Sequence, residues 1–451
     1  MNYSHDNHLY FYGGVHPDDS KKLSACEPIK DAPLLEKYTV IVGQNIGAPP
    51  KVIVKKGDIV KKGQKIAEAS AFVSANLHSP TSGTVSAITE IIGVFGAIVP
   101  AIEITSDGKD EACESTKIEP SKASPEELLA KIADAGLVGM GGAAFPTVVK
   151  LSPPKAKKID TLIINGAECE PYLTADYRLM LESPDKVLRG VAIFAKILGV
   201  NRIIIGVEAN KPDAIENLRK SHLLNEYGIE VKSLRVRYPQ GAEKQLIYAL
   251  TGRKVPSGGL PMDVACVVQN IGTSFAAYEA VYEGKTLYER VTTITGSRVV
   301  KPGNWRLRIG TPISKAIELC GGIKGDVAKI VAGGPMMGLA QISLDTTIMK
   351  SSSGILLLGN EEIIQYRNQP CIRCGNCVDV CPMELLPGPL CVYIENERFD
   401  LAEKEFVMDC MECGSCAYVC PSKRPLVQHF KRAKAEIIAK RKSQQLSQKA
   451  K

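Results

Sequence analysis

Short apolar runs separated by glycine turns mark the first quarter of the chain. Between residues 36 and 106 the runs TVIVGQ, KVIVKKGDIV and SGTVSAI have the length and β-branched composition of strands, and Gly57 and Gly63 stand where turns are needed. We therefore expect a small all-β unit over residues 36–106.

From residue 107 to about residue 285 the pattern changes to apolar strands that alternate with amphipathic helices. The strands are DTLIING, NRIIIGVE, VKSLRVRYP and DVACVVQN, and a helix such as Pro184–Leu198 lies between successive strands. This alternation is typical of a parallel sheet covered by helices on both faces. We expect an α/β domain over residues 107–285.

A shorter mixed region follows over residues 286–355, with VTTITG and WRLRIG as strands and PISKAIELCG as a helix. A cysteine-rich region occupies residues 360–430, and the helix-forming basic segment HFKRAKAEIIAKRKSQQLSQKAK contains the tail over residues 431–451. With an N-terminal segment over residues 1–35, the sequence predicts a multidomain α/β and α+β protein.

Charge is concentrated at the C-terminus. The net charge is +7, and the segment from Lys423 onward carries +9, which leaves −2 for the rest. The near-neutral body and the absence of a recognition motif argue against nucleic-acid binding. The tail suits either an anionic lipid surface or a solvated helix end.

Two features bear on location. The longest uncharged apolar run, between Glu90 and Glu103, has twelve residues and is too short to span a bilayer. The opening MNYSHDNHLYF lacks the basic and apolar regions of a secretory signal. We expect a cytoplasmic protein whose membrane association is peripheral.

Two cysteine boxes carry the clearest chemistry, and both read CxxCxxCxxxCP. Three thiolates at this spacing bind one four-iron cluster, and the fourth, beside the proline, ligates the other cluster. Zinc, the alternative, has no use for a third cysteine at the same step. The predicted ligand sets are Cys371, Cys374, Cys377 with Cys420, and Cys410, Cys413, Cys416 with Cys381.

The remaining six cysteines lack such spacing, and we expect them to be small buried apolar residues. They are Cys26, Cys113, Cys169, Cys266, Cys320 and Cys391.

The α/β region holds candidate ligand-binding loops. GLVGMGGAAFPT places several glycines just after an apparent helix, where backbone can approach a phosphate or a ring, although a tight turn is the alternative. Ligands of open parallel sheets bind beyond the carboxyl ends of the strands. We therefore expect NGAECEP, EAN, YPQGAEKQ and QNIGT to line one crevice.

These segments resemble two related families. GLVGMGGAAFPTVVKL and NGAECEP are similar to the FMN- and NADH-binding loops of the flavoprotein subunit of respiratory complex I, which run GRGGAGFP and NADESEP. YFYGGVHPDD, QNIGAP, YPQGAEKQLIYALTGRKVP and the two boxes resemble the RnfC family, a component of the Rnf electron-transport complex, over nearly the whole chain.

The Rnf resemblance implies a barrel-sandwich hybrid, a Rossmann-like FMN- and NADH-binding domain, an SLBB β-grasp domain and a ferredoxin-type domain with two 4Fe-4S clusters. KKGDIVKKGQKIAE and LHSPTSGTV further resemble biotinyl and lipoyl carrier domains. Phe72 stands at the place of the carriers' modified lysine, so we expect a scaffold role for this unit.

The resemblance also implies individual cofactor contacts. The glycines would lie against flavin or nicotinamide, the lysine near the FMN phosphate, and the remaining residues in the flavin and nucleotide loops. The residues are Gly139, Gly141, Gly142, Lys150, Asn165, Glu168, Glu170, Glu243, Asn270 and Thr273. Alternatively, the three glutamates favour helix N-termini and the lysine is solvated. This chain departs from the complex I loops at Met140, Ala167 and Ala242.

The resemblance implies a redox subunit in which NAD(H), FMN and the two clusters exchange electrons, because FMN converts two-electron into one-electron traffic. Its partners would be the ferredoxin-reading RnfB and integral membrane subunits that translocate Na⁺ or H⁺, on the cytoplasmic face of a bacterial membrane. Two alternatives are a soluble NADH-dependent cobalamin reductase and an iron–sulfur electron wire without a flavin.

Overall fold

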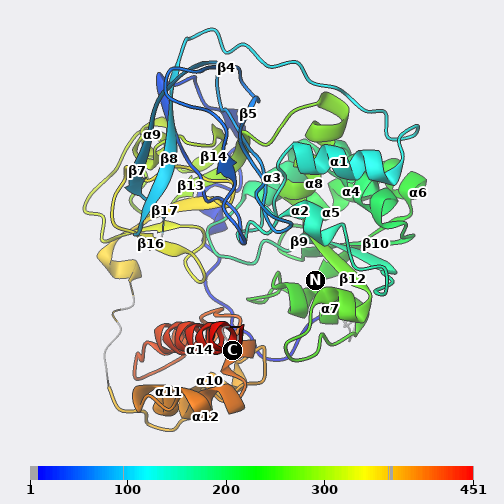
Figure 1. Cartoon of the computed structure of the whole chain (residues 1–451). Coiled ribbons are helices and arrows are strands. Elements are labelled where there is room, and N and C mark those ends of the chain that lie inside the picture. The colour runs from blue at the N-terminus through cyan, green and yellow to red at the C-terminus, as the bar shows by residue number, and fades with distance from the viewer. Residues whose placement is uncertain (1–8, 95, 364, 366–368, 450–451) are drawn as a thin grey trace.

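The computed structural model describes residues 9–94, 96–363, 365 and 369–449. The first eight residues of the expected N-terminal segment and the last two of the expected tail lie outside this part of the chain. Figure 1 shows a cysteine-rich module, coloured orange to red, beneath a larger body that contains the other three units.

The first unit consists of two small antiparallel sheets, as the sequence predicts. One sheet has the order β2-β8-β7-β4 and the other β3-β5-β6. The side chains of Val40, Ile66 and Ile102 are fully buried in its core. The strands are β2 (Lys37–Ile41), β3 (Lys51–Val52), β4 (Ile59–Val60), β5 (Lys65–Glu68), β6 (Leu77–His78), β7 (Gly83–Ile92) and β8 (Ile98–Ser106).

The α/β unit contains a parallel sheet of order β11-β10-β9-β12. Successive strand residues face opposite sides of a sheet, so Leu162 and Ile164 pack with the helices of one face and Ile163 with α7 on the other. The strands are β9 (Thr161–Gly166), β10 (Arg202–Glu208), β11 (Ile229–Leu234) and β12 (Cys266–Asn270). The expectation of a sheet covered on both faces is confirmed.

The helices of this unit begin and end close to where the periodicity predicts. They are α1 (Pro125–Asp134), α2 (Thr147–Lys150), α3 (Ala175–Glu182), α4 (Pro184–Leu198), α5 (Pro212–Lys220), α6 (Leu223–Tyr227), α7 (Glu243–Thr251) and α8 (Ile271–Tyr278), which a π-helical turn (Glu279–Glu283) extends. Gly190 lets α4 approach α8, because a Cβ there would lie 1.7 Å from the Ser274 carbonyl oxygen.

The SLBB-like unit has a six-stranded sheet of order β1-β14-β13-β17-β15-β16. Its strands are β13 (Glu289–Thr295), β14 (Gly303–Arg308), β15 (Lys329–Ala332), β16 (Leu339–Gln341), β17 (Gly354–Leu358) and β1 (Ile29–Asp31), and α9 (Ile313–Leu319) packs in the same core. The N-terminal segment thus contributes an edge strand, parallel to β14.

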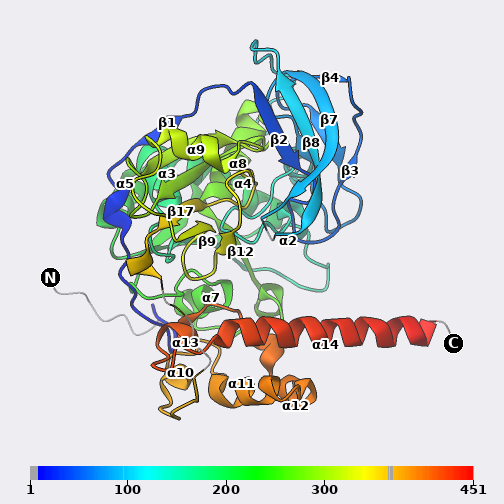
Figure 2. The ribbon, with the colours of Figure 1, turned by 90° about the vertical axis from the view of Figure 1, so that its left-hand side faces the viewer.

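The cysteine-rich module is built from helices around a small core. They are α10 (Asn376–Asp379), α11 (Pro387–Glu395), α12 (Phe399–Lys404), α13 (Ser415–Tyr418) and α14 (Leu426–Lys449), with a 3-10 turn over Val407–Asp409. Elsewhere in the chain, 3-10 turns span Lys21–Leu23, Pro261–Val264 and Asn360–Glu362. The basic tail is the continuation of α14, whose Phe430 and Ile437 are buried in this core, and Figure 2 shows its far end projecting beyond the module. Within the described residues, no helix combines the length and apolarity of a membrane span.

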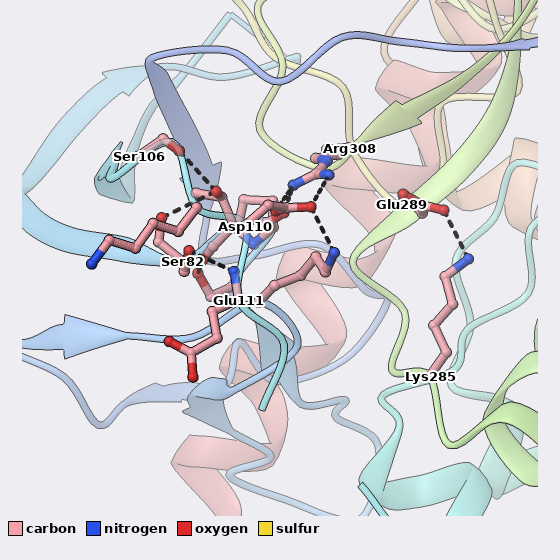
Figure 3. Close-up of polar contacts among 12 residues, drawn as sticks. Ser82, Ser106, Asp110, Glu111, Lys285, Glu289 and Arg308 are labelled. Carbon is pink, nitrogen blue, oxygen red and sulfur yellow. Dashed lines mark hydrogen bonds and ion pairs between the residues drawn. The ribbon is translucent and has the colours of Figure 1, made fainter. Parts of the chain in front are cut away.

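A half-buried carboxylate joins the barrel-sandwich unit to the SLBB-like sheet (Figure 3). Asp110, just after β8, accepts hydrogen bonds from Arg308 Nη2 at 2.7 Å and from Lys62 Nζ at 2.6 Å. Burial raises the pKa of Asp110, but the hydrogen bonds from the two cations outweigh it, so the pKa lies below its usual value. This joint fixes the first unit against β14.

We expect Asp110→Asn to lower the free energy of unfolding by about 2 kcal/mol, because it removes charge-assisted hydrogen bonds from two cations. The pKa of Asp110 is lower in the folded state than in the unfolded chain. The stabilisation by Asp110 is therefore present above about pH 4 and is lost as the pH falls through the folded-state pKa. Urea denaturation followed by the fluorescence of Trp305, the single tryptophan, measures it at neutral and acidic pH.

Asp31→Asn is the matched control, because Asp31 also pairs with an arginine of β14 but its side chain is 85% exposed. Its effect should stay under about 0.5 kcal/mol. Equal stability of the Asp110 variant and the unmodified chain at neutral pH would rule out the proposed role of this joint.

Candidate functional site

A cavity of about 820 Å³ lies where the four units meet. One wall is formed by loops at the carboxyl ends of β9, β11 and β12, and the opposite wall by SLBB-like residues 332–334, 337–339 and 349–353 except Lys350. The cysteine-rich module contributes Met383 and residues 408–411, and the β7–β8 hairpin contributes Val94. Its volume is in the range of protein cofactor sites.

Nine of the ten predicted cofactor residues line this cavity. They are Gly139, Gly141, Gly142, Lys150, Asn165, Glu168, Glu170, Glu243 and Asn270. The tenth, Thr273, is fully buried behind the glycine loop, where its Oγ1 accepts a hydrogen bond of 2.9 Å from Met140 N. Of the four post-strand segments, EAN does not line the cavity, because Glu208 is buried against Lys211 instead.

The glycine loop presents bare backbone to the cavity. Gly139 N donates to Phe145 O at 2.8 Å, which closes the loop on itself. Gly142 has φ 116° and no neighbour in the place of a Cβ, while Ala144 has φ 50°. Left-handed backbone at these positions is unfavourable for residues other than glycine and is concentrated at functional sites. The loop therefore has both the shape and the free space to receive a planar ligand or a phosphate.

Two predicted residues of the first wall also cap helices. Glu168, with φ 47°, accepts a hydrogen bond of 2.8 Å from Asp176 N at the start of α3. Asn270 accepts from Thr273 N at 3.2 Å and donates to Asp176 Oδ2 at 2.5 Å. Burial, together with the nearby Glu168 carboxylate, raises the pKa of Asp176 to about 7. The capping role expected as an alternative for Glu168 is thus present, on a residue that lines the cavity.

Glu170 connects the two walls. Its carboxylate accepts hydrogen bonds from Met336 N at 3.1 Å and Met337 N at 2.8 Å. A Cβ on Gly334 would lie 2.2 Å from Glu170 Oε2, so the SLBB-like loop needs glycine there. Burial raises the pKa of Glu170 to about 7, although the two N–H groups and Lys21 oppose the rise.

The residues at the α7 end of the cavity suit a phosphate. Lys150 Nζ is paired with Glu243, the first residue of α7, and donates to Val268 O at 3.2 Å. Asn165 donates to Gly241 O at 2.7 Å, which holds the loop before α7. A helix N-terminus beside an ammonium group favours an anion. Together with the bare glycine loop, this set of groups fits FMN.

The second cysteine box and Cys381 come together in the folded chain. Cys381, Cys410, Cys413 and Cys416 line one small, almost wholly apolar cavity. Burial raises the pKa of each of these four thiols, as it does for cysteines in apolar surroundings. Four thiols that converge in this way fit one four-iron cluster, with the ligand from the first box that the crossed pattern predicts.

The first box lies nearer the surface. Cys371 and Cys374 are exposed, and both interact electrostatically with the half-buried Cys377. Cys420 packs against the core of the same module, as Cys377 does. The module therefore presents one box to solvent and keeps most of the other buried.

The N-terminal segment and Tyr238 connect the cavity to the buried thiols. Tyr238 lines the cavity, and its hydroxyl donates to Cys413 O at 2.8 Å. Val15 forms an antiparallel bridge with Tyr238. Gly13 lies against Cys381, because a Cβ there would be 2.9 Å from the Cys381 carbonyl.

Family models match each unit of the chain. They are the RnfC barrel sandwich hybrid domain over residues 9–109, the Nuo51 FMN-binding domain over 132–279, the SLBB domain over 291–340 and the 4Fe-4S dicluster domain over 363–421. The second and fourth models imply FMN and two 4Fe-4S clusters.

Curated relatives match over nearly the whole length. The C subunit of the proton-translocating ferredoxin:NAD(+) oxidoreductase complex of Clostridium ljungdahlii is 52% identical, over 94% of this chain and 93% of the relative. Its counterpart in the Na(+)-translocating complex of Acetobacterium woodii is 45% identical, over 96% and 98%. The chain belongs to the RnfC family. An NAD+-reducing [NiFe]-hydrogenase chain also aligns, with TM-score 0.49 and 17% identity over 72% of this chain and 68% of that chain.

Sequence reasoning missed part of this RnfC-family cavity. Arg290 and Asp176 line it, as does the glycine-rich segment Gly333–Gly338 apart from Pro335 and Met336. Arg290 lies in a strand whose sequence has no feature that marks it as functional. The glycine-rich segment lies in a different domain from the flavin loops. No local pattern could have indicated that either faces the glycine loop.

The other cysteines follow the expectation only in part. Cys266, Cys320 and Cys391 are buried as predicted, but Cys26 is exposed, so that expectation was wrong for it. Cys391 forms a group with Glu395 and His429 whose side chains are close enough to hold a metal ion. Arg424 already donates to Cys391 Sγ at 3.2 Å and to Glu395, so a guanidinium occupies this position.

Proposed function

We propose that this RnfC-family chain transfers electrons between NAD(H) and a one-electron partner, as part of ferredoxin:NAD oxidoreduction coupled to Na⁺ or H⁺ translocation. When bound, FMN supplies the exchange between two-electron and one-electron carriers. The proposal is supported by the full-length match to the corresponding subunits of two such complexes.

One observation carries the proposal. Cys410 and Met411 line the same cavity as the predicted flavin residues Gly141 and Asn270. A cluster held by the second box would therefore border the flavin cavity, with no further protein layer in between. Electron transfer between flavin and cluster needs such proximity. A chain that used its clusters only as a separate electron wire would not need a cluster beside the flavin cavity.

The difference in exposure between the two boxes suggests the order in which the two clusters pass electrons. Cys410 lines the cavity and Cys413 and Cys416 are buried, whereas Cys371 and Cys374 are exposed. The second box would serve the flavin side and the first box the partner side. The same order serves electron flow in either direction.

The surrounding residues have separate tasks. The glycine loop leaves room for the ring, and Lys150 and the start of α7 would hold the phosphate. Glu170 of the flavin domain holds the SLBB-like loop that forms the opposite wall of the cavity, which would limit access of water. We propose that NAD(H) enters the remaining space of the same cavity, with Glu170 on its side.

The partners follow from the family. We propose that the ferredoxin-reading RnfB approaches the exposed Cys371 and Cys374, and that integral membrane subunits of the complex hold the chain peripherally on the cytoplasmic face. The near-neutral body and the projecting, basic α14 offer different surfaces for this assembly.

An anaerobic experiment tests the function. The purified chain, with clusters and FMN restored, is mixed with NADH, and the flavin absorbance and the cluster EPR signals are followed. We expect the flavin to bleach and the clusters to be reduced afterwards. Failure of the flavin to bind or to bleach would leave the electron-wire alternative. Rapid reduction of cobalamin by the chain without membrane subunits would favour the cobalamin reductase alternative.

A further inference from the structure

A buried arginine of the SLBB-like unit has no carboxylate partner among the residues that the structure describes. Arg290, in β13, is 3% exposed. Its Nε donates to Val291 O at 3.1 Å and its Nη2 to Met140 O at 3.2 Å, and Nη1 donates to Lys350 O. All three acceptors are backbone carbonyls, and no carboxylate of the described residues is within ion-pair distance of this guanidinium.

Asp176, Glu279 and Glu289 line a small cavity beside Arg290, but Glu279 and Glu289 are already ion-paired with Lys285. Asp176 interacts with Arg290 only at a distance, and its carboxylate already accepts from Asn270. A second buried basic group, Lys350, has among the described residues only carbonyl acceptors, Asn76 O and Gly136 O, each at 2.6 Å. Burying a charge without a counter-charge is costly, because the low-dielectric interior does not replace its hydration. A guanidinium stays protonated in spite of this cost.

The guanidinium lies where a ligand can supply the missing charge. Arg290 lines the cavity of the predicted flavin residues and holds the backbone of Met140 within the glycine loop. Met140 is apolar and buried, so the loop itself brings no cation to this position.

We propose that Arg290 is a cofactor-binding residue whose guanidinium provides the counter-charge for the negative charge of the bound flavin nucleotide. The SLBB-like unit would then complete the flavin site across the domain boundary, in addition to covering it. This inference rests on the proposed binding of FMN in the cavity.

Arg306 provides a matched control on the adjacent strand. It lies in β14 and lines a smaller cavity beside Arg290, but it is absent from the lining of the flavin cavity. It is also ion-paired, with Asp31 at 3.1 Å and Glu279 at 3.5 Å. Removing its charge should therefore not change flavin binding.

The test measures FMN affinity by flavin fluorescence and the flavin midpoint potential by redox titration, both on the full chain with its clusters. Arg290→Gln should weaken FMN binding about tenfold, the effect of losing one hydrogen bond to a charged group. Arg306→Gln should bind FMN as the unmodified chain does. Riboflavin, which has no phosphate, distinguishes the two possible sources of negative charge, the phosphate and the flavin ring. If Arg290 faces the phosphate, the riboflavin affinity of Arg290→Gln equals that of the unmodified chain. If Arg290 faces the ring, both the riboflavin affinity and the flavin midpoint potential of this variant fall.

Unchanged FMN affinity and potential in a folded Arg290→Gln chain would overturn the proposal. If that variant does not fold, Arg290→Lys is measured instead. It keeps the charge, so FMN affinity within about threefold is expected, and a loss of tenfold or more would mean that shape rather than charge matters. Absence of FMN binding by the unmodified chain would refute the proposed function itself, which is a separate outcome.

Discussion

Cys381→Ser is expected to remove the cluster of the second cysteine box and to leave the first one in place. Cys381 belongs to the first box by sequence, but it lines one cavity with Cys410, Cys413 and Cys416. Iron content should fall from about eight to about four atoms per chain. Flavin reduction by NADH should persist, while electron delivery to an external one-electron acceptor should fall to background, because the bordering cluster is lost.

Iron and sulfide analysis and EPR of the reduced protein measure this effect. Cys391→Ser is the control, since Cys391 is buried in the same module but lies outside both boxes. It should keep both clusters. Selective loss of the signal from the Cys371 box would refute the crossed ligand sets, and loss of neither cluster would show that Cys381 is not a ligand.

Lys150→Gln is expected to weaken FMN binding by about ten- to a hundredfold. The ammonium group stands beside the first residue of α7, where a phosphate would gain both its charge and the N–H groups of the helix. Riboflavin binding should hardly change, because riboflavin has no phosphate. Fluorescence titration with the two ligands measures both affinities.

Glu243→Gln sharpens this prediction. The carboxylate competes with a phosphate for Lys150, so its removal should leave FMN affinity unchanged or higher. Lys254→Gln is the control, because Lys254 is exposed on the same unit and paired with Glu384. An equal loss of FMN and riboflavin affinity in the Lys150 variant would place the lysine away from the phosphate.

Much of the secondary structure could be predicted from local patterns. The helix Pro184–Leu198 has the predicted bounds, and β9 and β12 follow their apolar runs within a few residues. These elements are determined by periodicity and by caps such as Gly199, which ends α4 in the left-handed conformation. Such signals involve residues close together in the chain.

Long-range pairings could not be predicted in the same way. Nothing in Ile29–Asp31 indicates that it pairs with β14, almost three hundred residues away. EAN follows a strand as the other loops do, yet Glu208 is held inward by Lys211. Burial and pairing of this kind depend on which surfaces meet after folding.

By itself, the sequence determined the chemistry: two boxes spaced for four-iron clusters and a glycine loop followed by polar residues at the ends of strands. For these motifs the spacing of residues along the chain is enough, because the geometry of the ligands and the direction of a strand depend on residues only a few positions apart. Only the tertiary structure decided that Cys410, Glu170 and Arg290 border one cavity. These residues come from three different units, and contacts between units arise from packing and charge complementarity that no local pattern records.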